Sequence, residues 1–146
     1  MTTIDRETIL GLIPHAGAMC LLDKILHWDE TSLRGLSHRY RDTDNPLRRA
    51  DGSLGTATGI EIAAQAMAAH GSLSAPQNTP PSRGYLVSLR DVALTAGPLD
   101  ANGGDLLIEI LRLLGDKNLA RYQFSLTAAG VPLLRGNATV LLGPTA

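Results

Sequence analysis

The clearest periodic pattern in the chain is helical and covers residues 58–74, TGIEIAAQAMAAHGSLS. One apolar stripe at helical spacing is formed by Ile60, Ala63, Ala64 and Met67. The other side of this helix is also small, with Ala66 and Ala69, and the Gly71–Pro76 region ends it. A helix that is apolar on most sides is suited to being wrapped closely by a sheet.

Strand patterns lie on both sides of this helix. Ahead of it, residues 24–40 hold two apolar runs around a turn at 29–31, which predicts two antiparallel strands. After it, apolar runs or period-two alternation predict four strands, over residues 85–94, 106–114, 120–126 and 134–140, with turns at 98–104 and 130–132. The polar residues 41–57 predict a long ordered loop, and the Pro-rich residues 76–84 a connector. A short opening helix is expected to end at Pro14.

The order of these elements predicts the fold class. A single apolar helix needs an apolar sheet face around it, and a curved antiparallel sheet supplies one. We therefore predict an α+β hotdog fold, with one long central helix, as a single domain over residues 1–146. The edges of such a sheet need partners, which favours a homodimer.

Composition excludes several function classes. The net charge is −1 and no block of like charges occurs, so nucleic acid is not an expected partner. Cys20 is the single cysteine, which rules out an internal disulfide and suits a reducing compartment. No signal peptide and no apolar run near the roughly 20 residues of a membrane helix is present, so we expect a cytoplasmic protein without membrane contact. No metal-ligand cluster or nucleotide-binding motif is present, and no cofactor is expected.

Glu61, in the first turn of the predicted helix, is the main candidate for chemistry. Its apolar surroundings favour the neutral carboxyl group, which could donate a proton near neutral pH. Gln65 lies one turn further on the same face and could orient Glu61. Gly59 and the helix N-terminus could polarise a thioester carbonyl. A structural alternative remains, because Thr58-Gly-Ile-Glu61 matches a capping box.

The histidines are the candidate bases. His15 lies in a Pro- and Gly-rich loop that would fix its imidazole, and His38 lies at the end of a predicted strand. His70 lies too far along the helix from Glu61 to share its proton chemistry, and His27 is expected on the surface. Arg48 and Arg49 could form a small basic spot for an acidic carrier protein, although adjacent arginines are usually just solvated.

Two segments resemble a known family. Ile13-Pro-His15-Ala-Gly-Ala-Met19-Cys-Leu-Leu-Asp23 resembles the Pro-His…Leu-Asp segment of the bacterial 3-hydroxyacyl-ACP dehydratases, and Glu61-Ile-Ala-Ala-Gln65 resembles their central helix. The likeness is greatest to the divergent branch found with aryl polyene synthases. Residues 37–39, 44–47, 59–67 and 87–91 also resemble that branch. The typical catalytic His-Phe-Pro-Gly loop is missing, because residues 47–54 contain no histidine.

The resemblance implies a dehydratase that converts a 3-hydroxyacyl thioester, carried on acyl carrier protein or coenzyme A, into the trans-2-enoyl thioester. Of that family's acid–base pair, only Glu61 maps directly. We expect His15 as the base with His38 second, and Gly59, Gln65 and His38 as substrate-binding residues. Two alternatives stay open. One is a thioesterase on the same fold, and the other is a non-catalytic acyl-binding partner subunit.

Overall fold

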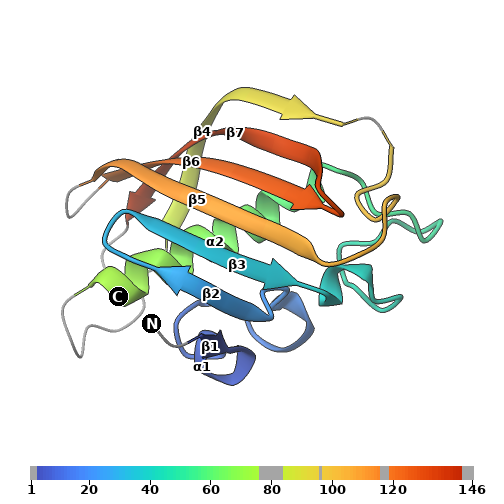
Figure 1. Ribbon diagram of the computed structural model, residues 1–146, viewed down its shortest axis with the longest axis horizontal. Coiled ribbons are helices and arrows are strands. Elements are labelled where there is room, and N and C mark those ends of the chain that lie inside the picture. Colours follow the sequence, from blue (N-terminus) through green and yellow to red (C-terminus); the bar gives the residue numbers. More distant parts are fainter. Residues whose placement is uncertain (1–2, 76–83, 96, 116–118, 143–146) are drawn as a thin grey trace.

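One antiparallel sheet and one long helix make up most of the chain. The computed structural model describes residues 3–75, 84–95, 97–115 and 119–142. Its elements are β1 (Ile4–Asp5), α1 (Arg6–Leu10), β2 (Lys24–Trp28), β3 (Ser32–Ser37), α2 (Thr58–Ser74), β4 (Gly84–Leu94), β5 (Leu106–Gly115), β6 (Leu119–Ala128) and β7 (Val131–Leu142). The strand order is β1-β2-β3-β5-β6-β7-β4. The sheet curves around α2 (Figure 1), which confirms the predicted α+β hotdog class.

The central helix has the bounds that its pattern predicts, and its small residues explain how closely the sheet approaches it. Ala63, Ala66 and Ala69 are fully buried. Gly59 faces the sheet, and a Cβ there would come within 2.9 Å of Leu134 Cδ2 and 3.0 Å of Leu126 Cδ2. A side chain at this position would therefore require the ends of Leu126 and Leu134 to move.

The N-terminal region differs from the prediction. Ile4 and Asp5 pair with β2, and the helix that follows ends at Leu10 rather than at Pro14. The Asp5 side chain accepts a hydrogen bond from Thr8 N, so it acts as an N-cap and fixes where α1 begins. The sheet pairing of Ile4 keeps that residue out of the helix. At the other end, Gly11 N donates to Thr8 O and Leu12 N to Ile9 O, and these tighter turns end the helix.

The last predicted turn differs from the structure in its position. The turn expected at residues 130–132 is made earlier, by Ala129 and Gly130, which both have positive φ values of 51° and 77°. Val131 already begins β7, and Pro132 lies inside that strand. The predicted connector at residues 76–84 lies outside the described residues except for Gly84, which begins β4.

Strand β4 forms one edge of the described sheet and hydrogen-bonds only to β7. Five large apolar side chains of this strand are exposed, namely Leu86, Val87, Leu89, Val92 and Leu94. An exposed apolar edge strand is a pairing site for another chain. At the other edge, β1 and α1 cover the lower side of the sheet (Figure 1).

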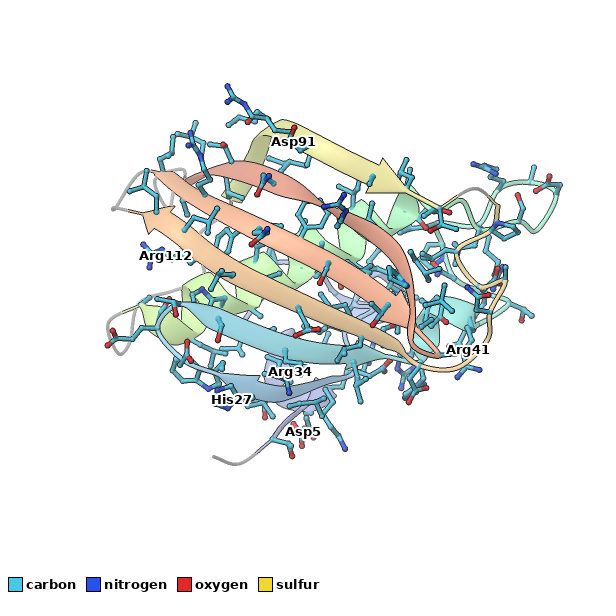
Figure 2. The ribbon with its side chains drawn as sticks, turned by 45° about the horizontal axis from the view of Figure 1, so that its top comes forward. Asp5, His27, Arg34, Arg41, Asp91 and Arg112 are labelled. Atoms are coloured by element: carbon cyan, nitrogen blue, oxygen red, sulfur yellow. The ribbon has the colours of Figure 1, made fainter. Side chains whose placement is uncertain are left out.

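The outer face of the sheet carries polar and charged side chains together with exposed apolar ones such as Leu111. Figure 2 shows His27 and Arg34 on the side of the sheet away from α2. Arg34 Nε lies 3.7 Å from Glu109 Oε2 on the neighbouring strand, an exposed ion pair of little energetic weight. Within the described ranges, no helix is long and apolar enough to cross a membrane.

Candidate active site

His15 and Glu61 form a direct pair. His15 Nε2 lies 2.7 Å from Glu61 Oε1, and their side chains are 23% and 35% exposed, so the pair is reachable from solvent. Glu61 comes from the first turn of α2, and His15 comes from the loop between α1 and β2. The two predicted groups thus meet in one chain, although they lie 46 positions apart in the sequence.

The loop that carries His15 is held from two sides. On α1, Arg6 Nη2 donates to Gly17 O at 2.7 Å and to Cys20 O at 3.1 Å. On α2, Gln65 Nε2 donates to Met19 O at 2.7 Å, and Gln65 Oε1 accepts from Leu21 N at 2.9 Å. The position of the His15 imidazole therefore depends on hydrogen bonds from both helices to the backbone of the same loop.

The pair also determines the charge of Glu61. The hydrogen bond from His15 holds the pKa of Glu61 below its ordinary value of 4.5, although burial of the carboxyl group opposes this shift. The free protein therefore keeps Glu61 as a carboxylate, contrary to the expectation that apolar surroundings make it neutral. Nε2 is the ring nitrogen of His15 that faces Glu61. The other ring nitrogen, Nδ1, is buried and has no hydrogen-bond partner among the described residues.

A cavity of about 210 Å³ adjoins the pair. It is lined by Pro14, His15, Ile60, Glu61, Ala64, Met67, Ala68, Gly71, Ser72, Leu86 and Val140. Apart from the pair and Ser72, every lining residue is apolar or glycine, so the cavity suits an apolar ligand with its reactive end at His15 and Glu61. A larger hollow of about 400 Å³ lies over the outer sheet face and includes Glu109, Gln123 and Arg135, but it contains neither member of the pair.

Glu61 does not cap α2. The residue before α2, Ala57, makes no side-chain capping hydrogen bond, and the Thr58 hydroxyl donates to Gly55 O at 2.6 Å. Glu61 instead contacts His15. A capping box is therefore wrong for this helix, and the carboxyl group is left for chemistry.

The predicted carbonyl-binding role of Gly59 does not fit its environment. Gly59 is buried against β6 and β7, and its N–H donates to Thr56 O at 2.9 Å. The neighbouring N–H groups of Thr58 and Ile60 donate to Gly55 O and Ala57 O. A turn precedes the helix and uses these donors, so they are not free to polarise a substrate.

His38 does not join the pair. Its imidazole is 56% exposed and lies 3.4 Å from Asp23 Oδ1, in a separate cluster with Arg39. Asp23 Oδ2 accepts from the N–H groups of His38 and Arg39, and Asp23 Oδ1 accepts from Arg39 Nε at 2.7 Å. This buried carboxylate joins the end of β3 to the start of β2, and His38 is neither the base nor a substrate contact in this geometry.

The other histidine on α2 is structural. His70 is fully buried, with Nδ1 2.9 Å from the Tyr122 hydroxyl and Nε2 2.9 Å from Asp29 O. Burial lowers the pKa of His70, so the neutral ring is favoured, with Nε2 as the donor to the carbonyl. His27 is half exposed near Asp29, as expected of a surface residue.

The predicted basic spot at residues 48 and 49 is largely used within its own loop. The Arg48 guanidinium donates to Arg41 O, Asp42 O and Gly52 O, and to Asp100 Oδ2 at 3.0 Å. Arg48 thereby orders residues 41–52, and its side chain is only 13% exposed. It is not available as a docking cation.

Gln65 was expected to contact substrate, but it is fully buried and its amide is bonded to Met19 and Leu21. Its replacement by leucine leaves the Met19 carbonyl and the Leu21 N–H without these partners. We expect the free energy of unfolding to fall by about 2–4 kcal/mol, and turnover to fall because the His15 loop loses its contact with α2.

The Gln65→Leu effect is measured by urea unfolding together with steady-state kinetics, with Gln123→Leu on the exposed outer face as the matched control. If Gln65 only stabilises the fold, kcat per folded molecule stays at the wild-type value. A loss of kcat in the fully folded variant identifies it as a positioning residue for His15.

Sequence reasoning overlooked Arg6. It is an unremarkable position in a short helix, and nothing in its spacing connects it with residues 17 and 20. Only the fold of the loop against α1 brings its guanidinium to those carbonyl groups.

Comparisons with known proteins agree on the family and the fold. The sequence model of the ApeP-like family, described as ApeP dehydratase, matches residues 7–145. Among solved structures, the dehydratase heterocomplex ApeI:P from Xenorhabdus doucetiae is similar with a TM-score of 0.82 and 21% identity, over 94% of this chain and 91% of that chain. Among curated protein sequences, none matches.

Two thioesterases share the fold at lower similarity. A variant of thioesterase PA1618 from Pseudomonas aeruginosa has a TM-score of 0.67 and 13% identity, over 99% of this chain and 97% of that chain. Thioesterase HI1161 from Haemophilus influenzae has a TM-score of 0.65 and 12% identity, over 97% of this chain and 92% of that chain. At these identities the likeness concerns the fold alone.

Proposed function

The chain belongs to the ApeP-like dehydratase family, and from that premise we propose that it removes water from a 3-hydroxyacyl thioester to give the trans-2-enoyl thioester. The observation that carries this proposal is the His15–Glu61 pair, 2.7 Å apart, at one end of an apolar cavity. A base and an acid side by side, next to space for an acyl chain, are what elimination of water requires.

The proposed reaction assigns one proton transfer to each residue. His15 Nε2 takes a proton from the carbon next to the thioester carbonyl, and that electron pair forms the new carbon–carbon double bond. The carbon–oxygen bond of the 3-hydroxyl group breaks, and Glu61 gives a proton to the departing oxygen, so that water leaves. A proton then passes from Nε2 back to Glu61 and restores the starting state.

This cycle needs two protons on the pair, one on Nδ1 and one shared between Nε2 and Glu61. In the free protein Glu61 is the carboxylate, because its pKa is lowered. An acyl chain in the cavity displaces water and favours the uncharged arrangement, in which Glu61 carries the proton. Substrate must also separate the two groups, because 2.7 Å leaves no room for it between them.

We further propose that the acyl group is presented on acyl carrier protein, and that the pathway is aryl polyene biosynthesis, as the family resemblance implies. The exposed apolar edge of β4 supports pairing with a second subunit. That subunit is either a second copy of this chain or a different hotdog protein, and the similar solved structure is itself a heterocomplex.

The proposed function is tested by incubating the purified protein with a 3-hydroxyacyl thioester and following both enoyl product and free thiol. We expect the enoyl thioester without thiol release. Release of thiol would assign the chain to the thioesterases instead. If neither product forms, with free or carrier-linked substrate, the dehydratase proposal fails for this chain alone and a binding or partner-dependent role replaces it.

A further inference from the structure

We propose that Gly71 sets the length of the acyl chain that this protein accepts, at the far end of a straight groove whose floor is Ala64 and Ala68. The inference rests on the proposed function, because it places the acyl chain of the same substrate in the cavity beside His15 and Glu61. It goes further in naming the residue that determines chain length and the shape of chain that fits.

The floor of the groove is one face of α2. Ala64, Ala68 and Gly71 follow one another at helical spacing, and all three are half-buried and line the cavity. Their side chains have one carbon or none, so these three positions leave space along the helix, and Met67 borders that space from the same helix. A larger residue at any of these positions would occupy the cavity itself.

The sides of the groove come from separate parts of the chain. Pro14 and His15 belong to the loop after α1, whereas Leu86 and Val140 belong to β4 and β7. The one other polar side chain, Ser72, donates its hydroxyl to Leu12 O at 2.5 Å. The groove therefore offers apolar contacts to a ligand and no additional polar group to anchor a substituent on the chain.

The length of the groove follows from the helix. Glu61 and Gly71 are ten residues apart, which is about 15 Å along an α-helix. With carbon–carbon bonds of about 1.5 Å in a zigzag, this distance holds roughly a dozen carbons in an extended chain. Because the floor is a straight helix face, it suits an unbranched chain held straight, including a rigid conjugated one.

Gly71 is the position at which the space can be changed without disturbing the fold. A Cβ built on Gly71 meets no atom of the described residues within 4 Å, so there is space for an added side chain. Leucine is also a better helix former than glycine, so Gly71→Leu is expected to fold at least as well as the original chain. A larger side chain at Ala64 or Ala68 would instead lie nearer to His15 and Glu61.

The experiment compares wild-type protein, Gly71→Ala and Gly71→Leu on saturated and 3-hydroxyacyl thioesters of 4 to about 12 carbons. Calorimetry gives the affinity for the saturated thioesters, and turnover gives kcat/KM for the hydroxylated ones. Ser74→Leu is the matched control, because Ser74 is exposed in the same last turn and does not line the cavity.

We expect Gly71→Leu to lower affinity and kcat/KM for the longest chain at least tenfold and to leave the shortest unchanged, with Gly71→Ala between them. An unchanged ratio of long- to short-chain values in Gly71→Leu, or the same loss in Ser74→Leu, overturns the inference. A length-dependent loss of affinity without turnover of any substrate would support the groove and reject the dehydratase function, so the two failures are distinguishable.

Discussion

Replacement of Glu61 by glutamine is expected to lower kcat by about 10²–10⁴-fold, the usual contribution of a positioned general acid. The amide has nearly the same shape and can still accept a hydrogen bond from His15 Nε2, which lies 2.7 Å from the present carboxylate oxygen. It cannot give a proton to a departing hydroxyl group. The variant therefore separates proton donation from the mere presence of a polar side chain at this position.

The measurement is single-turnover formation of the enoyl thioester, with Glu109→Gln on the exposed outer face as the matched control. Folding of Glu61→Gln is checked by its thermal transition. A variant that keeps more than a tenth of the wild-type rate would reject the acid role of Glu61. We expect Glu61→Gln to fold, because the side chain is 35% exposed and the amide keeps the size of the carboxyl group.

The pH dependence provides a second measure of the same carboxyl group. Because the pKa of Glu61 is lowered, the ion pair stabilises the folded state above pH 4.5 and that contribution is lost as pH falls through the lower pKa of the folded state. The unfolded chain binds this proton first, so stability rises with pH in that window. We expect Glu61→Gln to show a smaller loss of thermal stability on acidification below pH 4.5 than the wild-type protein does.

The central helix could be predicted from the sequence because its information is local. Alanine-rich helical spacing and the glycine and proline that follow mark α2, and its predicted range of residues 58–74 matches the structure. Alternation with a period of two similarly marks β6, where alternate residues are buried, and β7. The β1 pairing of Ile4 with Ile25 is not local, and it was missed for that reason.

The candidate site shows the same division. Glu61 stood out as an acid in an apolar helix, but local pattern could not decide between capping and chemistry. His15 and His38 could not be separated either, because their partners are set by loops that return from distant parts of the chain. Gln65 is the clearest case, since its position one turn from Glu61 indicated a substrate contact. A hydrogen bond from Gln65 is among the causes that lower the pKa of Glu61, as its position suggests. Its amide also bonds to a backbone segment 44 and 46 positions away, which no local pattern indicates.

Replacement of His15 by glutamine is expected to reduce kcat to a similar extent, about 10²–10⁴-fold, because the amide has no basic nitrogen to take the proton next to the thioester carbonyl. Glutamine still places an N–H donor near Glu61, so the hydrogen bond can persist without the base. His38→Gln is the matched control. His38 is exposed in the separate Asp23 cluster, and its loss is expected to change kcat less than twofold.

The double variant His15→Gln, Glu61→Gln decides whether the two residues act together. If one concerted elimination uses both, the double variant is little slower than either single variant, because either change alone already removes the shared proton transfer. If instead the loss of kcat in the double variant equals the product of the two single losses, the residues act in independent steps. A thioesterase in which Glu61 alone activates water would lose thiol release in Glu61→Gln but keep it in His15→Gln. The three variants therefore distinguish a cooperating acid–base pair from a single carboxylate, and the 2.7 Å contact between the side chains predicts the former.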